Sequence, residues 1–341
     1  MKQLILRRLA LLPFVAVGVT LLLFFLTQML SPEIRASLYV KDPIQLDSLE
    51  DVIREHGLRD PAIKQYAGWV KRLARGELGY SETARMPVTE AIKAYLPATI
   101  ELAVCAMIPV IFIGIWAGTL SAVKKGKTAD QISGFIAITG YSMPTFVLGL
   151  LLLMIFYGTL GWLPPGRCSL ATDMVINSGD FRHWTGFLTI DSLLNLNFSV
   201  FFDLIKHFVL PAATLCYAGV ALMIRTTRSS MLEEMEKDYI GTARAKGLME
   251  SEVMRKHAGR NALISVMTMS GLQFVRLLGG VVITETVFDF PGIGRWGVLA
   301  AQQLDIPGVL GFSLMTAALL ITGNLVTDLL YMYTDPRIRV S

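Results

Sequence analysis

Six apolar segments constrain this chain more than any other feature of its sequence. Each contains about the 20 mainly apolar residues that a helix needs to cross a bilayer. Backbone hydrogen bonds must be satisfied inside the hydrocarbon, so each segment predicts a transmembrane helix. With 53% hydrophobic residues in 341, the chain is expected to be an all-α, polytopic membrane protein with six transmembrane helices. The segments cover roughly residues 9–30, 97–123, 131–157, 207–225, 263–285 and 307–332.

Small residues and prolines inside these segments predict how the helices pack. Gly114 and Gly118 have the small-residue spacing that lets two membrane helices approach closely. Pro144 in the third segment and Pro211 in the fourth are expected to kink their helices. The first segment resembles a signal peptide, but it is long and lacks a clear cleavage site, which favours a retained span.

Basic residues in the short connections predict the orientation. They precede the first segment, lie between the second and third, and close the chain: Arg7, Arg8, Lys124, Lys125, Lys127, Arg337 and Arg339. With six spans all of these fall on one side, which the positive-inside rule makes cytoplasmic, so both termini are expected to be cytoplasmic. The segment 31–96 is longer than about 60 residues and is expected to cross regardless of its charge.

These assignments divide the chain into four parts. Residues 1–30 form the first transmembrane helix, 31–96 a periplasmic helical segment, 97–332 the transmembrane core and 333–341 a cytoplasmic tail. The core includes two long loops. Loop 158–206 is periplasmic, aromatic and weakly charged, as suits contact with a partner, and loop 226–262 is cytoplasmic.

Reactive groups do not form a catalytic or metal-binding pattern. GWLPPGRC at 161–168 has the glycine spacing of a phosphate loop, but Arg167 and Cys168 replace the lysine and the hydroxyl residue. The four histidines are scattered, and the three cysteines suggest small apolar fillers or idle thiols. We therefore expect no catalytic residue, no metal, no cofactor bound by this chain and no nucleic-acid partner.

A few ionisable or polar residues inside the spans are candidates for a translocation pathway. They are Arg276, Glu285, Asn324 and Asp328. Burying a charge in the bilayer costs at least about 2.5–3.5 kcal/mol, so such groups should face protein or water. A polar pathway and a structural ion pair both fit Arg276 and Glu285. For Glu101, near the outer end of the second span, and for Asp328 the structural interpretation is favoured.

The cytoplasmic loop 226–262 is too charged for hydrocarbon and too rich in helix formers for a simple linker. Asp238 is expected to cap a helix over 239–246, and Gly247 to end it in a left-handed conformation. Ser251 is expected to cap a second helix that runs toward Asn261 and into the fifth span. The loop suits either a docking surface for a partner that supplies energy or a solvated connection.

The sequence DYIGTARAKGL, followed by HAGRNAL, closely resembles the cytoplasmic signature loop of ABC-type importer permeases, in the dipeptide, oligopeptide and nickel permease family. Six further motifs agree and occur in order: LILRRLALL, LPATIELAVCAMI, GYSMPTF, RTTRSSMLE, TETVFDFPGIGRW and DLLYMYTDPRIR. The resemblance covers nearly the whole chain and is strongest to the first permease of a dipeptide system.

The resemblance implies a type I ABC importer permease fold in a bacterial inner membrane. It also implies a second homologous permease, two cytoplasmic ATPases that bind ATP and Mg, and a periplasmic peptide-binding protein. The chain itself would be a non-catalytic subunit. The ATPase-coupling residues would be Tyr239, Ile240, Thr242, Ala243, Arg244, Ala245, Lys246, Gly247 and Leu248.

The sequence departs from the family pattern in two places, where Ile264 and Ser265 replace a Leu-Pro and Arg276 replaces a small neutral residue. Thr242, Ala243 and Arg244 stand where the signature of the wider superfamily begins with Glu-Ala-Ala, as is common in peptide permeases. Nickel, haem or a glycoside are alternative cargoes, because related permeases share the loop. A carrier driven by an ion gradient, using Arg276, Glu285 and Asp328, is a further alternative.

Overall fold

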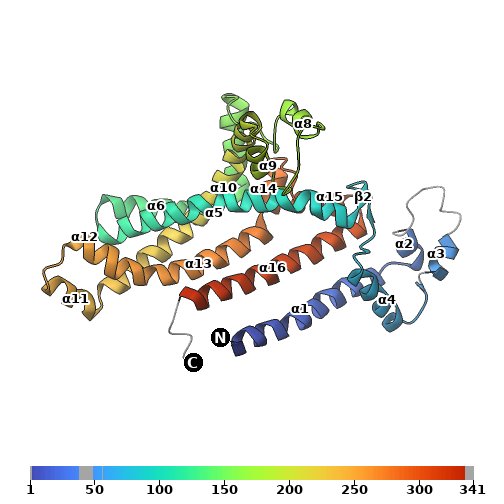
Figure 1. Cartoon of the computed structure of the whole chain (residues 1–341), viewed down its shortest axis with the longest axis horizontal. Coiled ribbons are helices and arrows are strands. Elements are labelled where there is room, and N and C mark those ends of the chain that lie inside the picture. The colour runs from blue at the N-terminus through green and yellow to red at the C-terminus, as the bar shows by residue number, and fades with distance from the viewer. Residues whose placement is uncertain (1, 38–48, 56, 335–341) are drawn as a thin grey trace. The chain divides into compact units, whose positions relative to one another are not determined.

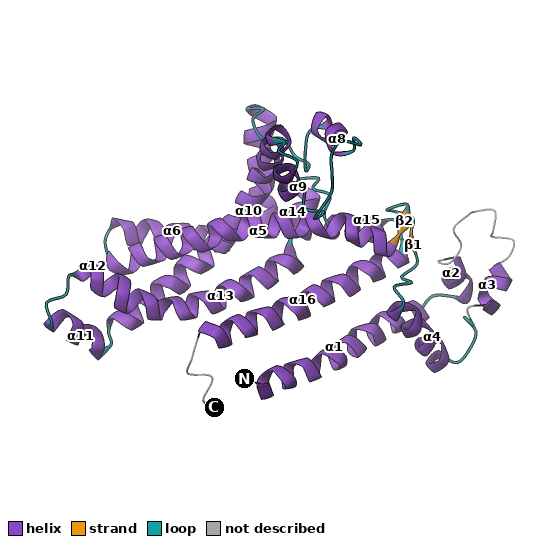
Figure 2. Ribbon diagram, in the orientation of Figure 1, coloured by secondary structure: helices purple, strands orange, loops and turns teal. Residues whose placement is uncertain are grey.

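The computed structural model describes residues 2–37, 49–55 and 57–334, and most of them are helical (Figures 1 and 2). The chain divides into two compact units. The first contains Met1–Thr99 and Pro291–Ile321, and the second Ile100–Phe290 and Thr322–Ser341. Helices α5 and α16 each contribute residues to both units.

The elements follow one another in this order: α1 (Lys2–Gln28), α2 (Pro32–Ser37), α3 (Leu49–Glu55), α4 (Ala62–Ala74), β1 (Tyr80–Ser81), β2 (Met86–Pro87), α5 (Val88–Val123), α6 (Thr128–Ser142), α7 (Thr145–Leu152), the π-helical segment η2 (Leu153–Thr159), α8 (Leu170–Ile176), α9 (Leu188–Leu194), α10 (Phe198–Met235), α11 (Asp238–Ala245), α12 (Glu250–Glu252), the π-helical segment η3 (Val253–Ala258), α13 (Gly259–Gly280), α14 (Val282–Val287), α15 (Ile293–Gln302) and α16 (Ile306–Thr334).

In the first unit, α1 packs against α4. Helix α4 belongs to segment 31–96, which the sequence predicts to be helical and periplasmic. The Phe24 ring meets the Tyr66 ring edge to face, with 5.3 Å between the ring centroids. The Tyr66 hydroxyl lies 2.9 Å from that of Thr20. The predicted helices in 31–96 are confirmed over the described residues, and His56 lies outside them.

A short antiparallel hairpin is the one departure from the expected all-α fold that the described residues show. Ser81 on β1 pairs with Met86 on β2. The Ser81 hydroxyl donates to Asp305, whose carboxylate also accepts the backbone N–H of Thr83 at 3.1 Å. The Trp296 indole donates to the Ser81 oxygen at 3.2 Å. These buried contacts hold the hairpin against α15 inside the first unit.

The second unit is built around α10, which packs against α6 and α13 (Figure 1). A Cβ added at Gly114 would collide with Met223 of α10, and one at Gly118 with Thr227. The predicted close approach through Gly114 and Gly118 is therefore confirmed, and it lies between α5 and α10.

All six predicted spans coincide with helices, but their lengths and shapes differ from the prediction. Among the described residues, three helices are long and apolar enough to cross a membrane: Val88–Val123, Phe198–Met235 and Ile306–Thr327. The predicted span 131–157 is instead a pair, Thr128–Ser142 and Thr145–Thr159, bent by 103°. Pro144 precedes the second helix of that pair, so the predicted kink is confirmed there and is sharp. Pro211 lies inside α10, which continues through it.

Candidate functional site

Helix α11 is a short amphipathic element whose buried face packs on its own chain. Ile240 is 0% exposed and Ala243 6%. They belong to an apolar cluster with residues of α5, α10, η3 and α13. The other buried members of that cluster are Ala122, Met231, Val253, Met254, Ala258 and Ala262, and Tyr239 and Leu248 pack at its edge.

Helix α11 and the turn after it also present an exposed face, beside the buried one. It carries Thr242, Arg244, Ala245 and Lys246. Thr242 is therefore accessible to a partner, whereas the neighbouring Ala243 faces the interior of the chain. Of the nine residues predicted to couple to an ATPase, those on this face and Gly247 are accessible in the isolated chain.

Gly247 ends this element as the sequence predicted. The helix stops at Ala245, and Gly247 has φ +77°. A Cβ at Gly247 would meet nothing within 4 Å, so the requirement for glycine comes from the backbone conformation alone. The predicted cap at Asp238 is wrong by one residue, because Lys237 occupies the N-cap position and Asp238 begins the helix.

An exposed ion pair spans the turn at Gly247. Arg244 donates to both carboxylate oxygens of Glu250, at 3.1 Å from Nε and 2.7 Å from Nη2. The carboxylate raises the pKa of Arg244, and the guanidinium lowers the pKa of Glu250. The bidentate geometry fixes α11 relative to α12.

The Tyr239 side chain ties α11 to the two long helices on either side of the loop. Its hydroxyl donates to Glu234 Oε2 of α10 at 2.6 Å and accepts from Asn261 Nδ2 of α13 at 2.9 Å. Burial and the bond to Glu234 raise the pKa of Tyr239, so the hydroxyl stays protonated. Nothing in the sequence pattern joins these three residues, because Tyr239 and Asn261 are 22 positions apart.

The second half of the loop leads directly into α13. The predicted cap at Ser251 is wrong, because the helical region already begins with α12 after Met249. It continues through η3 into α13 without a break. Ile264 and Ser265, which replace the Leu-Pro of the family pattern, lie inside the uninterrupted α13. A hollow of about 330 Å³ beside this segment is lined by Met249, Ser251, Glu252, Arg255 and Lys256.

The candidate pathway residues are not gathered at one surface. Arg276 on α13 and Asn324 on α16 are exposed, whereas Glu285 in α14 is 0% exposed. Asp328 belongs to α16, but its side chain lies outside the described part of the structure. Helices α13 and α16 pack closely where Gly271 faces Thr327 and Gly323 faces Val275. A role in translocation stays a prediction for the four candidate residues, Arg276, Glu285, Asn324 and Asp328.

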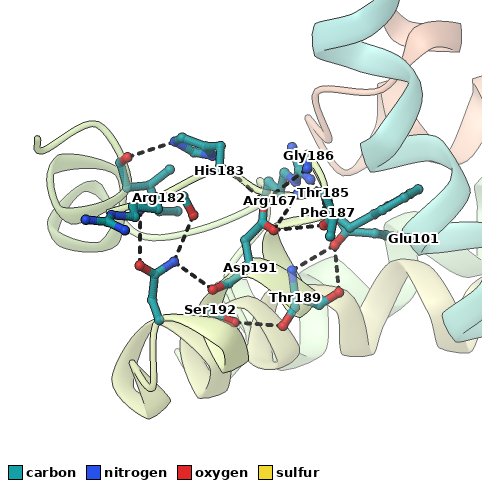
Figure 3. A network of polar contacts seen from close by, with 12 residues as sticks. Glu101, Arg167, Arg182, His183, Thr185, Gly186, Phe187, Thr189, Asp191 and Ser192 are labelled. Atoms are coloured by element: carbon teal, nitrogen blue, oxygen red, sulfur yellow. Dashed lines mark hydrogen bonds and ion pairs between the residues drawn. The ribbon is translucent and has the colours of Figure 1, made fainter. Parts of the chain in front are cut away.

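Glu101 takes part in a structural ion pair, as its position favoured (Figure 3). Its carboxylate accepts from Arg167 Nη2 at 2.5 Å, and the two side chains are 3% and 12% exposed. It also accepts the Thr189 backbone N–H at 2.8 Å and the Thr189 hydroxyl at 2.6 Å. Arg167, noted in the sequence only as a poor substitute for a phosphate-loop lysine, therefore joins loop 158–206 to α5.

Asp191 organises the adjoining part of loop 158–206 (Figure 3). The fully buried carboxylate accepts the backbone N–H groups of Thr185 at 2.9 Å and Gly186 at 3.1 Å. It also accepts the Thr185 hydroxyl at 2.8 Å. Asn195 bonds in both directions with the Arg182 backbone. Loop 158–206 is consequently an ordered structure built on α8 and α9.

Long apolar helices, together with a short, partly exposed helix that Tyr239 ties to α10 and α13, characterise a multi-pass membrane protein. Comparison with known proteins identifies the family. The model of binding-protein-dependent transport system inner membrane components matches residues 110–340. The dipeptide transport system permease protein DppB of Escherichia coli K12 is 40% identical over 339 residues, 99% of each chain.

The di/tripeptide transport system permease protein DppB of Pseudomonas aeruginosa is also 40% identical, over 340 residues and 99% of each chain. A solved structure of the MetNI methionine ABC transporter in inward-facing conformations has a TM-score of 0.49 and 13% identity, covering 70% of this chain and 93% of that chain. The chain belongs to the family of binding-protein-dependent transport system inner membrane components. It is thus a multi-pass transport permease of the inner membrane.

Proposed function

We propose that this chain is one of the two permeases of an ATP-driven importer that carries dipeptides, or short peptides, into the cell. The observation that carries the proposal is 40% identity, over 99% of both chains, to permeases named for dipeptide and di/tripeptide transport. The extent of that coverage matters, because both the candidate pathway residues and the coupling loop fall within it.

Helix α11 is the proposed contact with an ATPase subunit. Its exposed face would lie in a groove of that subunit, as in other helix-in-groove complexes. Its buried face and the Tyr239 hydroxyl are tied to α10 and α13. Movement of the ATPases would therefore be passed to both helices as a rigid-body change between two packings. ATP and Mg would be bound by the ATPases.

The remaining partners follow from the same proposal. Loop 226–262 and both termini would be cytoplasmic, and loop 158–206 would face a periplasmic peptide-binding protein. A second, homologous permease would cover surfaces that are exposed in the single chain, including Arg276 and Asn324. The pathway would lie between the two permeases.

Transport by the reconstituted complex tests this function. The tagged chain is copurified with its partners and placed in proteoliposomes with ATP on the ATPase side. We expect a labelled dipeptide to accumulate only when the binding protein and ATP are both present, and excess nickel, haem or glycoside to leave its uptake unchanged. Accumulation of one of those cargoes instead would contradict the peptide assignment. Uptake by the chain alone, driven by a proton gradient, would contradict the ATP-driven mechanism.

A further inference from the structure

A groove of about 540 Å³ lies beside α6 and α10 in the second unit. Most of its lining is apolar and comes from both helices: Gly134, Ala137, Ile138, Ala221, Leu222 and Ile224. A Cβ added at Gly134 would meet nothing within 4 Å, so the groove is open at this position. The coupling residues of α11 are not part of it.

One end of the groove is strongly polar, and the Asp130 carboxylate accepts several hydrogen bonds there. The Asp130 carboxylate accepts from Arg228 Nε at 2.7 Å and Arg228 Nη2 at 3.0 Å. It also accepts the Ser121 hydroxyl at 2.5 Å and the Gly126 backbone N–H at 2.9 Å. These bonds fix the turn between α5 and α6 at the end of the groove. They also pair the charge of Asp130 with that of Arg228.

Positive charge remains at this end after Asp130 and Arg228 have paired. Arg225, which also lines the groove, is exposed and lies one helical turn before Arg228. The turn fixed by Asp130 adds three exposed lysines: Lys124, Lys125 and Lys127. A cationic end therefore adjoins an apolar channel, which is the arrangement that suits a ligand with an anionic head and a hydrocarbon tail.

We propose that this groove binds an anionic phospholipid of the inner leaflet. The phosphate would lie against Arg225 and the lysine turn, and one acyl chain would lie along the apolar lining at Gly134 and Ile138. The lysine turn is on the side that the positive-inside rule assigns to the cytoplasm. That leaflet is the one rich in anionic headgroups, and basic pockets between helices on that side bind such headgroups.

The neighbouring surface of α6 is consistent with lipid on this side of the helix. Phe135 and Ile138 are both 68% exposed, and Tyr141 is 82% exposed. Exposed apolar and aromatic side chains of this kind are accommodated by acyl chains. The proposal is independent of the cargo and of the ATPase contact.

Native mass spectrometry of the purified complex tests the proposal, with phosphatidylglycerol and phosphatidylethanolamine as probes. Replacing Arg225→Gln removes one basic contact and is expected to weaken phosphatidylglycerol binding about fivefold, equivalent to ~1 kcal/mol. Phosphatidylethanolamine binding should not change. Arg260→Gln, an exposed arginine of α13 outside the groove, is the matched control.

A second variant tests the apolar part of the groove. Gly134→Leu fills open space on a helix, so folding should be preserved, and it should abolish the retained phosphatidylglycerol adduct. Gly18→Leu, also placed in open space but on α1, should have no effect. Unchanged adducts in both groove variants, or equal binding of the two lipids to the unmodified complex, would overturn the proposal. So would efficient crosslinking of Gln131→Cys to the second permease, because protein would then occupy the groove.

Discussion

Glu101 shows how a charge near a membrane span is accommodated by pairing. Replacing Glu101→Gln leaves Arg167 largely buried without a carboxylate. Removing one partner of a buried pair typically costs about 3–5 kcal/mol. We expect a clear fall in the thermal unfolding temperature of the purified complex and faster proteolysis of loop 158–206.

A second glutamate on the same helix provides the control. Glu90 pairs with Lys93, but the side chains are 55% and 72% exposed. Glu90→Gln is expected to cost less than about 1 kcal/mol, as exposed pairs do. Equal unfolding temperatures for the two variants would show that the Glu101–Arg167 pair does not stabilise the packing of loop 158–206 on α5.

Cys168 gives a prediction about pH. Burial raises the pKa of this thiol to about 11 from an ordinary value of 9.0. At pH 8 the reactive thiolate should therefore be about a hundredfold scarcer than for an ordinary cysteine. Alkylation by iodoacetamide should be slow at pH 8 and accelerate toward pH 11, as followed by mass spectrometry. Rapid reaction at pH 8 that levels off near pH 9 would contradict this environment.

The sequence predicted the backbone conformation of one key residue but not the side-chain partners or the burial of others. The left-handed Gly247 was predictable, because a glycine after a short helical stretch is a local signal. The Glu101–Arg167 pair and the Tyr239–Asn261 bond were not, since their partners are 66 and 22 positions apart. The family resemblance placed Ala243 among the coupling residues, but its burial could not be predicted from the sequence, because it depends on η3 and α13 packing against α11.

The contact between α5 and α10 depends on two glycines of α5. A side chain at Gly118 would meet Thr227 and, at 2.9 Å, the Ile224 carbonyl oxygen, which belongs to the backbone and cannot move aside easily. Gly118→Val should therefore destabilise the chain by about 1–3 kcal/mol, as overpacking does. Thermal unfolding in detergent measures this, with Gly134→Val as the control in open space. Wild-type stability of Gly118→Val would contradict the close approach.

Under the proposed function, helix α8 is the expected contact with the binding protein. Leu170 is 73% and Met174 65% exposed, while another part of loop 158–206 is held by Asp191 and Glu101. The double substitution of Leu170→Ser and Met174→Ser should weaken association with the binding protein about fivefold or more, because residues near the centre of an interface carry most of its binding energy. Leu304→Ser, an exposed apolar residue elsewhere, is the control. Unaltered affinity of the double variant would exclude α8 from the contact.

Elements were predicted more reliably than their ends. Hydrophobic length located a helix at every predicted span, because about 20 apolar residues leave few alternatives in a bilayer. It could not set the 103° bend of the third span or extend α10 over Phe198–Met235. Pro144 predicted that the third span bends but not by how much, and α10 continues through charged residues that hydrophobic length does not count.

At the scale of the whole molecule, the fold joins the short helix α11 to the long helices α10 and α13. Family membership assigns the chain to a binding-protein-dependent transport system. Under the proposed function, the contacts of Tyr239 and the buried face of α11 would pass the movement of a docked ATPase to α10 and α13. No local sequence pattern could have revealed that route, because it is formed by three separate segments.

ATP hydrolysis by the reconstituted complex, with and without dipeptide-loaded binding protein, tests the coupling role of the α11 turn most directly. A valine at the left-handed Gly247 position is strained by more than about 1–2 kcal/mol, so Gly247→Val should reorient the turn. Gly18→Val is the control. We predict that the Gly247 variant inserts into the membrane but loses all dipeptide-stimulated hydrolysis. Stimulation equal to that of the unmodified complex would contradict the coupling role.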